Sequence, residues 1–151
     1  MPLYRTATEA ETIALGARLA AELPRGVVLL IGNLGAGKTT LAKGIASGVG
    51  AASPDDVSSP TFTLIHEYGH GLVYHVDLYR LEEAREVAGL GLDDLIDSGA
   101  LVLIEWGERF PELFPPPRTE IHLRALPDDS REIEVRQLRA CPEEAVPDSG
   151  C

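Results

Sequence analysis

The spacing of hydrophobic and polar residues changes several times along the chain, and each change marks an expected element. Residues 27–31 and 101–104 are apolar without interruption, which is typical of strands buried on both faces of a sheet. Residues 8–23 and 39–49 instead repeat small and apolar residues at the spacing of an amphipathic helix. A buried strand followed by a helix, and later by a second buried strand, predicts an α/β domain with parallel strands at its centre.

Shorter elements are expected around this centre. Two antiparallel strand pairs are predicted, over residues 61–68 with 72–76 and residues 120–124 with 133–138. Short helices are predicted over residues 81–87, 92–96 and 108–114. We therefore expect one three-layer α/β/α domain over residues 1–139, with a mixed sheet that is parallel at its centre and antiparallel at the hairpin and the C-terminus. Residues 140–151 are expected to form a flexible tail.

Composition and charge limit what this domain binds by itself. The 151 residues include 24 acidic and 13 basic side chains, so the net charge is −11. Binding to a nucleic-acid backbone requires clustered positive charge, and we expect any RNA to be held mainly by a partner. No apolar run approaches the roughly 20 residues of a membrane span. Cys141 and Cys151 lack metal-ligand spacing, and we expect unpaired thiols in the cytoplasm.

One segment carries a specific chemical signal. Residues 32–39 read Gly-Asn-Leu-Gly-Ala-Gly-Lys-Thr and fit the pattern G-x-x-x-x-G-K-[ST] of a phosphate-binding loop. Glycines let backbone N–H groups approach a polyphosphate, and the next helix adds its free N-terminal N–H groups. Lys38 can reach the β- and γ-phosphates, and Thr39 offers a hydroxyl to Mg²⁺. The sequence therefore predicts a site for a nucleoside triphosphate with Mg²⁺.

A metal-dependent hydrolase also needs carboxylates near the phosphates, and two predicted strands end in one. Glu105 follows the apolar run 101–104, and Asp77 follows the strand 72–76. We favour Glu105 as the Mg²⁺ partner of Thr39 and Asp77 as a second acid that binds metal-bound water or orients the attacking water. The two roles could be exchanged.

Two further residues have both a functional and a purely structural interpretation. Thr61 precedes the predicted hairpin, where it is a candidate sensor of the γ-phosphate or an ordinary turn hydroxyl. Trp106 directly follows Glu105 and is either at the rim of the site or a half-buried core aromatic. His75, on a predicted strand, is expected in the core.

Four segments together resemble the TsaE (YjeE) family. They are GNLGAGKTTLAKG at 32–44, SSPTFTLIHEY at 58–68, VYHVDLYRL at 73–81 and LVLIEWGERF at 101–110. A phosphate-binding loop alone is shared by many families, whereas the other three segments in this order are far more specific. The resemblance covers residues 8–138.

This resemblance implies a small bacterial ATPase in the formation of N6-threonylcarbamoyladenosine at position 37 of tRNAs that read ANN codons. It implies ATP and Mg²⁺ as ligands, the TsaB–TsaD heterodimer as partner, and contact with tRNA only through that complex. Matching positions imply that Thr39 and Glu105 bind Mg²⁺ and that Asp77 and Trp106 are needed for activity. The implied nucleotide contacts are Thr8 or Glu9, Gly35, Ala36, Gly37, Lys38, Thr39, Thr40 and Arg131.

Two other functions stay open on the sequence alone. The chain could be a small P-loop kinase, although residues 89–114 lack the arginine cluster expected of a kinase lid. It could also be a nucleotide-gated assembly factor that needs binding but no hydrolysis. Phosphoryl transfer to a metabolite would favour the kinase, and tRNA modification that survives loss of hydrolysis would favour the assembly factor.

Overall fold

The computed structural model describes residues 3–33, 37–51, 53 and 64–139. Gly35, Ala36, Thr61 and the expected tail 140–151 therefore lie outside the described residues. The elements in chain order are β1 (Leu3–Thr6), α1 (Glu9–Ala20), β2 (Gly26–Ile31), α2 (Lys38–Gly48), β3 (Ile65–Tyr68), β4 (Val73–Asp77), α3 (Ala84–Ala88), α4 (Leu92–Asp97), β5 (Leu101–Glu105), the 3-10 turns η2 (Gly107–Arg109) and η3 (Pro111–Leu113), β6 (Arg118–Ala125) and β7 (Arg131–Leu138).

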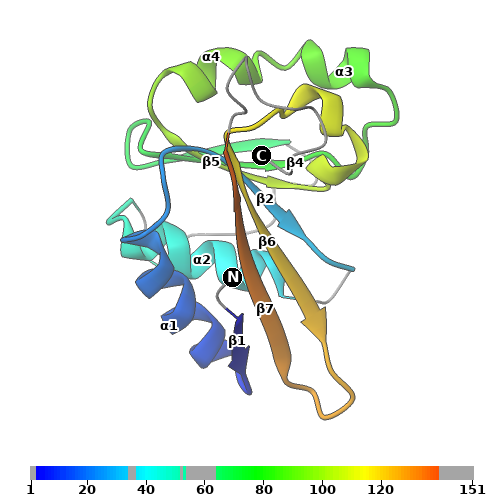
Figure 1. The fold of residues 1–151 in the computed structure, drawn as a ribbon. Helices are drawn as coiled ribbons and strands as arrows, with labels where there is room; N and C mark the ends of the chain where they lie inside the picture. The colour runs from blue at the N-terminus through cyan, green and yellow to red at the C-terminus, as the bar shows by residue number, and fades with distance from the viewer. Residues whose placement is uncertain (1–2, 34–36, 52, 54–63, 140–151) are drawn as a thin grey trace.

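The described strands form one sheet in the order β1-β7-β6-β2-β5-β4-β3 (Figure 1). β2 lies at its centre and pairs in parallel with both β5 and β6, while β4 pairs in parallel with β5. The pairs β3–β4, β6–β7 and β1–β7 are antiparallel. The expected mixed sheet, parallel at its centre and antiparallel at both sides, is confirmed.

Helices cover both faces of the central strands (Figure 1). Val28 and Leu30 of β2 belong to a buried cluster with residues of α1 and α2. Val27 and Leu29 belong to a second cluster with residues of α3, α4 and the segment 110–114. Successive side chains of a strand point to opposite faces, so a strand that is buried on both sides must be apolar throughout. The three-layer α/β/α arrangement is confirmed.

The contact between α1 and α2 is close because glycines lie where the helices meet. A Cβ added to Gly44 would lie 2.1 Å from the carbonyl oxygen of Ile13, and one added to Gly16 would lie 2.6 Å from that of Leu41. Backbones can approach this closely only where side chains are absent. This contact positions α2, whose first turn carries Lys38 and Thr39.

Several predicted boundaries differ from the structure. β1 was not predicted; it is a four-residue edge strand, too short to give a periodic pattern. The predicted helix 8–23 spans Glu9–Ala20, with Thr8 as its N-cap. The predicted helix 81–87 begins only at Ala84, because Glu83 and Glu86 form a capping box at that point.

The predicted helix 108–114 is wrong. The segment forms the two 3-10 turns η2 and η3, separated by Phe110 with a φ of −131°. Pro111 lacks the N–H group that a continuous helix would need at that position. Of the predicted strand 61–68, residues 64–68 are described, and β3 begins at Ile65. No helix among the described residues has both the length and the apolar character needed to cross a bilayer.

Candidate active site

The phosphate-binding loop joins the end of β2 to the start of α2. Gly37 is the N-cap of α2 and has a φ of 102°, a left-handed conformation that L side chains rarely adopt. None of the described side chains caps this end of the helix. The first N–H groups of α2 therefore remain available to an anion, as a phosphate site requires.

The two predicted carboxylates come together beside this helix end. Asp77 is the last residue of β4 and lies directly opposite Glu105, the last residue of β5. On its other side Glu105 pairs with Leu30, which lies one residue before the end of β2. Parallel strands place their carboxyl ends at one edge of the sheet, where ligands of such sheets bind. Both carboxylates are buried, with exposed fractions of 3% and 4%.

Thr39 reaches across to one of these acids. Its hydroxyl donates to Oε2 of Glu105 over 3.3 Å. Asp77 instead accepts a hydrogen bond of 2.9 Å at Oδ1 from the backbone N–H of Tyr79. Thr39 therefore contacts Glu105, the acid that we favoured as its Mg²⁺ partner, and the binding of a cation there stays a prediction.

Lys38 is buried at the centre of this group, with 5% of its surface exposed. Its Nζ atom has no hydrogen-bond partner among the described residues and lies 3.6 Å from the centroid of the Trp106 ring. Burial lowers the pKa of the Lys38 ammonium, and the carboxylates of Glu105, Glu108 and Asp77 oppose that shift. A buried cation that lies on an aromatic face and lacks a hydrogen-bond partner among the described residues is well suited to bind phosphate oxygens.

Trp106 takes part in the site and also packs against the core. Its φ of 69° is unusual for a residue other than glycine, and it is the N-cap of η2. The half-buried ring packs against the second hydrophobic cluster. Its centroid lies 5.2 Å from the centroid of the Tyr79 ring. Both sequence interpretations of Trp106 therefore describe part of its environment.

Glu108 is a site residue that the sequence interpretation missed. It lies in η2, its Oε1 atom is buried without a partner among the described residues, and burial raises the pKa of its carboxyl. Lys38 lies near enough to oppose that shift. The segment IEWGE carried a usable signal, because a second acid three residues after Glu105 could turn back towards the same site.

A second group of predicted contacts lines a cavity of about 140 Å³ next to the phosphate-binding loop. The cavity lies between the start of α1, the start of α2 and the turn before β7. Its walls include five residues predicted to contact nucleotide: Thr8, Glu9, Gly37, Thr40 and Arg131. The structure thus places all the described candidates in two adjoining groups, one around Lys38 and one in this cavity.

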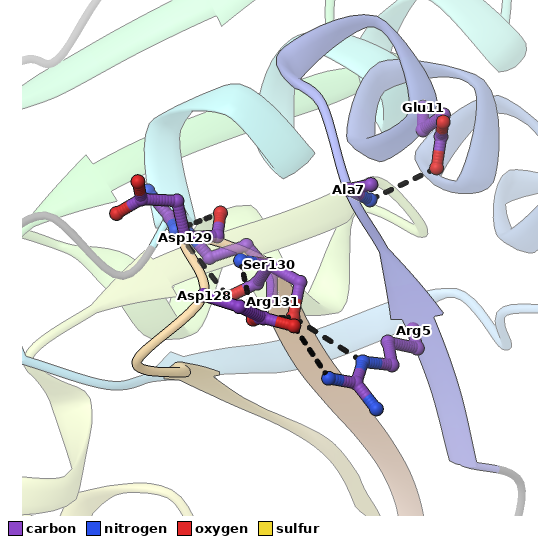
Figure 2. A network of polar contacts seen from close by, with 7 residues as sticks. All are labelled: Arg5, Ala7, Glu11, Asp128, Asp129, Ser130 and Arg131. Atoms are coloured by element: carbon purple, nitrogen blue, oxygen red, sulfur yellow. Dashed lines mark hydrogen bonds and ion pairs between the residues drawn. The ribbon is translucent and has the colours of Figure 1, made fainter.

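Figure 2 shows a network of polar contacts next to this cavity, and Ala7, Asp129 and Arg131 of the network line the cavity. Arg5 of β1 forms an ion pair of 2.9 Å with Asp128 and a hydrogen bond of 3.2 Å to Ser130 Oγ. Glu11 accepts a hydrogen bond of 2.9 Å from the backbone N–H of Ala7, which secures the start of α1. The two contacts of Arg5 join β1 to the turn between β6 and β7, and Arg131 is the first residue after this turn. They could not be predicted without β1.

Comparisons with known proteins agree with this architecture. The family model described as "Threonylcarbamoyl adenosine biosynthesis protein TsaE" matches residues 6–133. A Bacillus subtilis protein named tRNA threonylcarbamoyladenosine biosynthesis protein TsaE is 42% identical over 133 residues, covering 86% of this chain and 82% of the relative. A Nostoc protein of the same name is 42% identical over 138 residues, covering 85% and 82%.

A solved structure extends the likeness from sequence to fold. The crystal structure of YdiB from Bacillus subtilis has a TM-score of 0.68 and 37% sequence identity, and the match covers 87% of this chain and 82% of that chain. The family model reaches from the end of β1 into β7 and so includes every strand that positions the site. On this extent of agreement in sequence and fold, the chain belongs to the TsaE family.

Proposed function

We propose that this protein hydrolyses ATP to ADP and phosphate in support of N6-threonylcarbamoyladenosine formation at position 37 of tRNAs that read ANN codons. One observation carries the proposal. The buried ammonium of Lys38 lacks a hydrogen-bond partner among the described residues and lies where α2 begins, beside the Thr39–Glu105 pair. A triphosphate would supply the missing acceptor oxygens.

The residues present also suit Mg²⁺. This ion prefers oxygen ligands and is usually held by one or two carboxylates together with phosphate and water. Glu105 and the Thr39 hydroxyl lie together and would hold it, with Asp77 alongside. When bound, Mg²⁺ would neutralise charge on the phosphate oxygens.

The reaction we propose is attack of water on the γ-phosphorus, with cleavage of its bond to the bridging oxygen of ADP. Negative charge then grows on the leaving oxygen and on the phosphoryl oxygens. Lys38 and the N–H groups at the start of α2 would stabilise that charge, because they are already fixed in place before the reaction. Asp77 would orient the water.

The cavity beside the loop would hold the rest of the nucleotide. Thr8, Glu9 and Arg131 line it, and Gly37 links it to the phosphate-binding loop. Arg131 lies close to Gly37, since a Cβ on that glycine would be 3.6 Å from Arg131 Nε. A nucleotide that spans both groups would contact α1, α2 and β7 at once.

We further propose that the protein acts with a TsaB–TsaD heterodimer in the cytoplasm and meets tRNA through that complex. The names of the relatives support a role in tRNA threonylcarbamoyladenosine synthesis. The net charge of −11 argues against direct binding of the tRNA backbone by this chain. We expect slow hydrolysis by the isolated chain and faster hydrolysis when the partner completes or gates the site.

Phosphate release from ATP tests this proposal, measured for the chain alone and with TsaB–TsaD. We expect a slow basal rate, a faster rate in the mixture, and loss of both in Lys38→Ala. Equal rates with and without the partner would contradict the gating role. Transfer of phosphate to a metabolite would indicate the kinase instead. Reconstituted tRNA modification that survives Glu105→Ala but fails in Lys38→Ala would indicate the assembly factor.

A further inference from the structure

The proposed reaction assigns no role to His75, although this residue contacts Glu105. It lies on β4, its side chain is 0% exposed, and its Nε2 atom is 2.5 Å from Oε2 of Glu105. Contacts between an imidazole and a carboxylate at this distance are among the shorter and stronger hydrogen bonds in proteins. Any buried polar ring needs a hydrogen-bond partner, and the partner of His75 is the carboxylate that also contacts Thr39.

The strand register places His75 behind Glu105 as seen from the sheet edge. Asp77 pairs with Glu105, and His75 pairs with Leu103, one step further inside along the same face. That face is the one covered by α1 and α2, since Val73 and Leu103 belong to their cluster. His75 therefore contacts the carboxylate from the interior of the protein, while Thr39 contacts it from α2.

The chemistry of the two partners decides which of them donates the hydrogen bond. Nδ1 of His75 is buried and has no hydrogen-bond partner among the described residues. A carboxylate that binds a cation is ionised, so Nε2–H of His75 must be the donor to Glu105. Nε2 of His75 therefore carries the proton of this hydrogen bond.

We infer that His75 is a positioning residue: it holds one oxygen of Glu105, and so orients the carboxylate towards a divalent cation shared with Thr39. The inference rests on the proposed function. Oε2 of Glu105 accepts from both His75 and Thr39, while none of the described residues donates to Oε1. One oxygen is fixed by the protein, and the other is left for a ligand.

Loss of this hydrogen bond should act on the cation and not on the nucleotide. Residues that orient a metal ligand typically contribute about 10- to 100-fold in metal affinity. Without the His75 donor, Glu105 can rotate away from the cation position, whereas Lys38 and the start of α2 are unchanged. We therefore expect weaker divalent-cation binding with unaltered nucleotide affinity in the absence of metal.

Two variants and one matched control test this. His75→Leu removes the donor at similar volume, and His75→Gln keeps an amide N–H at about the reach of Nε2. His122→Leu is the control, because His122 also contacts a glutamate, Glu120 at 2.9 Å, on the opposite face of the sheet. Mn²⁺ affinity for the ADP complex is measured by electron paramagnetic resonance, and the affinity for a fluorescent ADP analogue is measured in EDTA.

For His75→Leu we expect Mn²⁺ affinity to fall by about 10-fold or more, with nucleotide affinity in EDTA unchanged. His75→Gln should recover most of the Mn²⁺ affinity, and His122→Leu should match the wild type. The inference is overturned if His75→Leu binds Mn²⁺ normally. It is also overturned if the Gln variant is as weak as the Leu variant, since that would indicate a packing role only.

A measurement on the unmodified protein covers the case in which His75→Leu does not fold. Ring ¹⁵N chemical shifts should show a proton on Nε2 of His75, and a ring without a proton on Nε2 would overturn the inference. The proposed function fails separately: a wild type that binds Mn²⁺ and ADP but releases no phosphate contradicts hydrolysis and leaves the comparison of His75 variants decisive. A wild type that binds no Mn²⁺ with ADP contradicts both.

Discussion

At the scale of single residues, the site is organised around Lys38. Its ammonium is buried, lies on the face of Trp106, and has three carboxylates near it. A buried cation is costly unless it is compensated, and here the compensation comes from an aromatic ring and nearby negative charge. Phosphate oxygens would compensate it better, so nucleotide binding should draw Lys38 away from the ring.

This contact can be followed directly, because Trp106 is the only tryptophan. We expect saturating ADP with Mg²⁺ to change the tryptophan emission as the lysine leaves the ring. In Lys38→Ala the change should be smaller at the same saturation. Emission spectra of the wild type that are identical with and without bound nucleotide would contradict this movement of Lys38.

Glu108 gives a pH-dependent prediction. Burial raises the pKa of its carboxyl above the ordinary value of 4.5, so its ionised form disfavours the folded state at neutral pH. Glu108→Gln should therefore raise the melting temperature by a few degrees at pH 7 to 8. The gain should disappear as the pH falls below about 4.5, where the wild-type carboxyl is protonated in both states.

The control for this prediction is Glu112→Gln, because Glu112 is an exposed acid in the next turn of the chain. It should change the melting temperature little at any pH. A melting temperature of Glu108→Gln that equals the wild type at pH 8, or a gain that grows towards acid pH, would show that burial does not penalise the charge of Glu108.

Residues that belong to a local motif could be predicted from the sequence, and residues that depend on register could not. Lys38 and Thr39 lie in one short pattern, and Glu105 ends an apolar run. His75 was expected in the core, where it lies, but its contact with Glu105 joins residues 30 positions apart. That contact depends on the parallel pairing of β4 with β5, which a pattern of hydrophobic residues does not specify.

At the scale of elements, the close contact of α1 with α2 positions the start of α2. Gly44→Ala would place a Cβ 2.1 Å from the carbonyl oxygen of Ile13, so the helices must move apart. We expect a loss of about 1–3 kcal/mol in the free energy of unfolding, as is typical of overpacked interiors. Nucleotide affinity should fall with it, because the first turn of α2 shifts.

The matched control is Gly89→Ala at the end of α3. Gly89 has a φ of −73°, and an added Cβ would lie no nearer than 3.5 Å to another atom. Chemical denaturation of both variants should therefore show a stability change for Gly44→Ala only. Equal stability of the Gly44 variant and the wild type would mean that the two helices do not need this close approach.

Long periodic elements could be predicted from the sequence, whereas short ones at the edges could not. The strands and helices that build the phosphate site follow clear patterns over residues 26–31 and 38–48. β1 spans four residues, and contacts with distant parts of the chain stabilise it: the pairing with β7 and the contacts of Arg5 with the turn before β7. The turns η2 and η3 occupy the segment predicted as one short helix, which Pro111 interrupts in the middle.

At the scale of the whole molecule, the fold brings distant segments to one edge of the sheet. That edge brings together Gly37 at the start of α2, the ends of β4 and β5, the start of α1 and the turn before β7. A ligand that binds several of these segments should stabilise the whole domain, by about 2.7 kcal/mol at 100 times its dissociation constant. The function that we propose places nucleotide at this edge.

The most direct test is a calorimetric titration of the purified chain with a non-hydrolysable ATP analogue in the presence of Mg²⁺. The account predicts saturable binding to one site, at least tenfold weaker in Lys38→Ala and unchanged in Lys43→Ala, the chain's other lysine. No binding at saturating analogue at either of two temperatures, or equal affinity in the Lys38 and Lys43 variants, would contradict it.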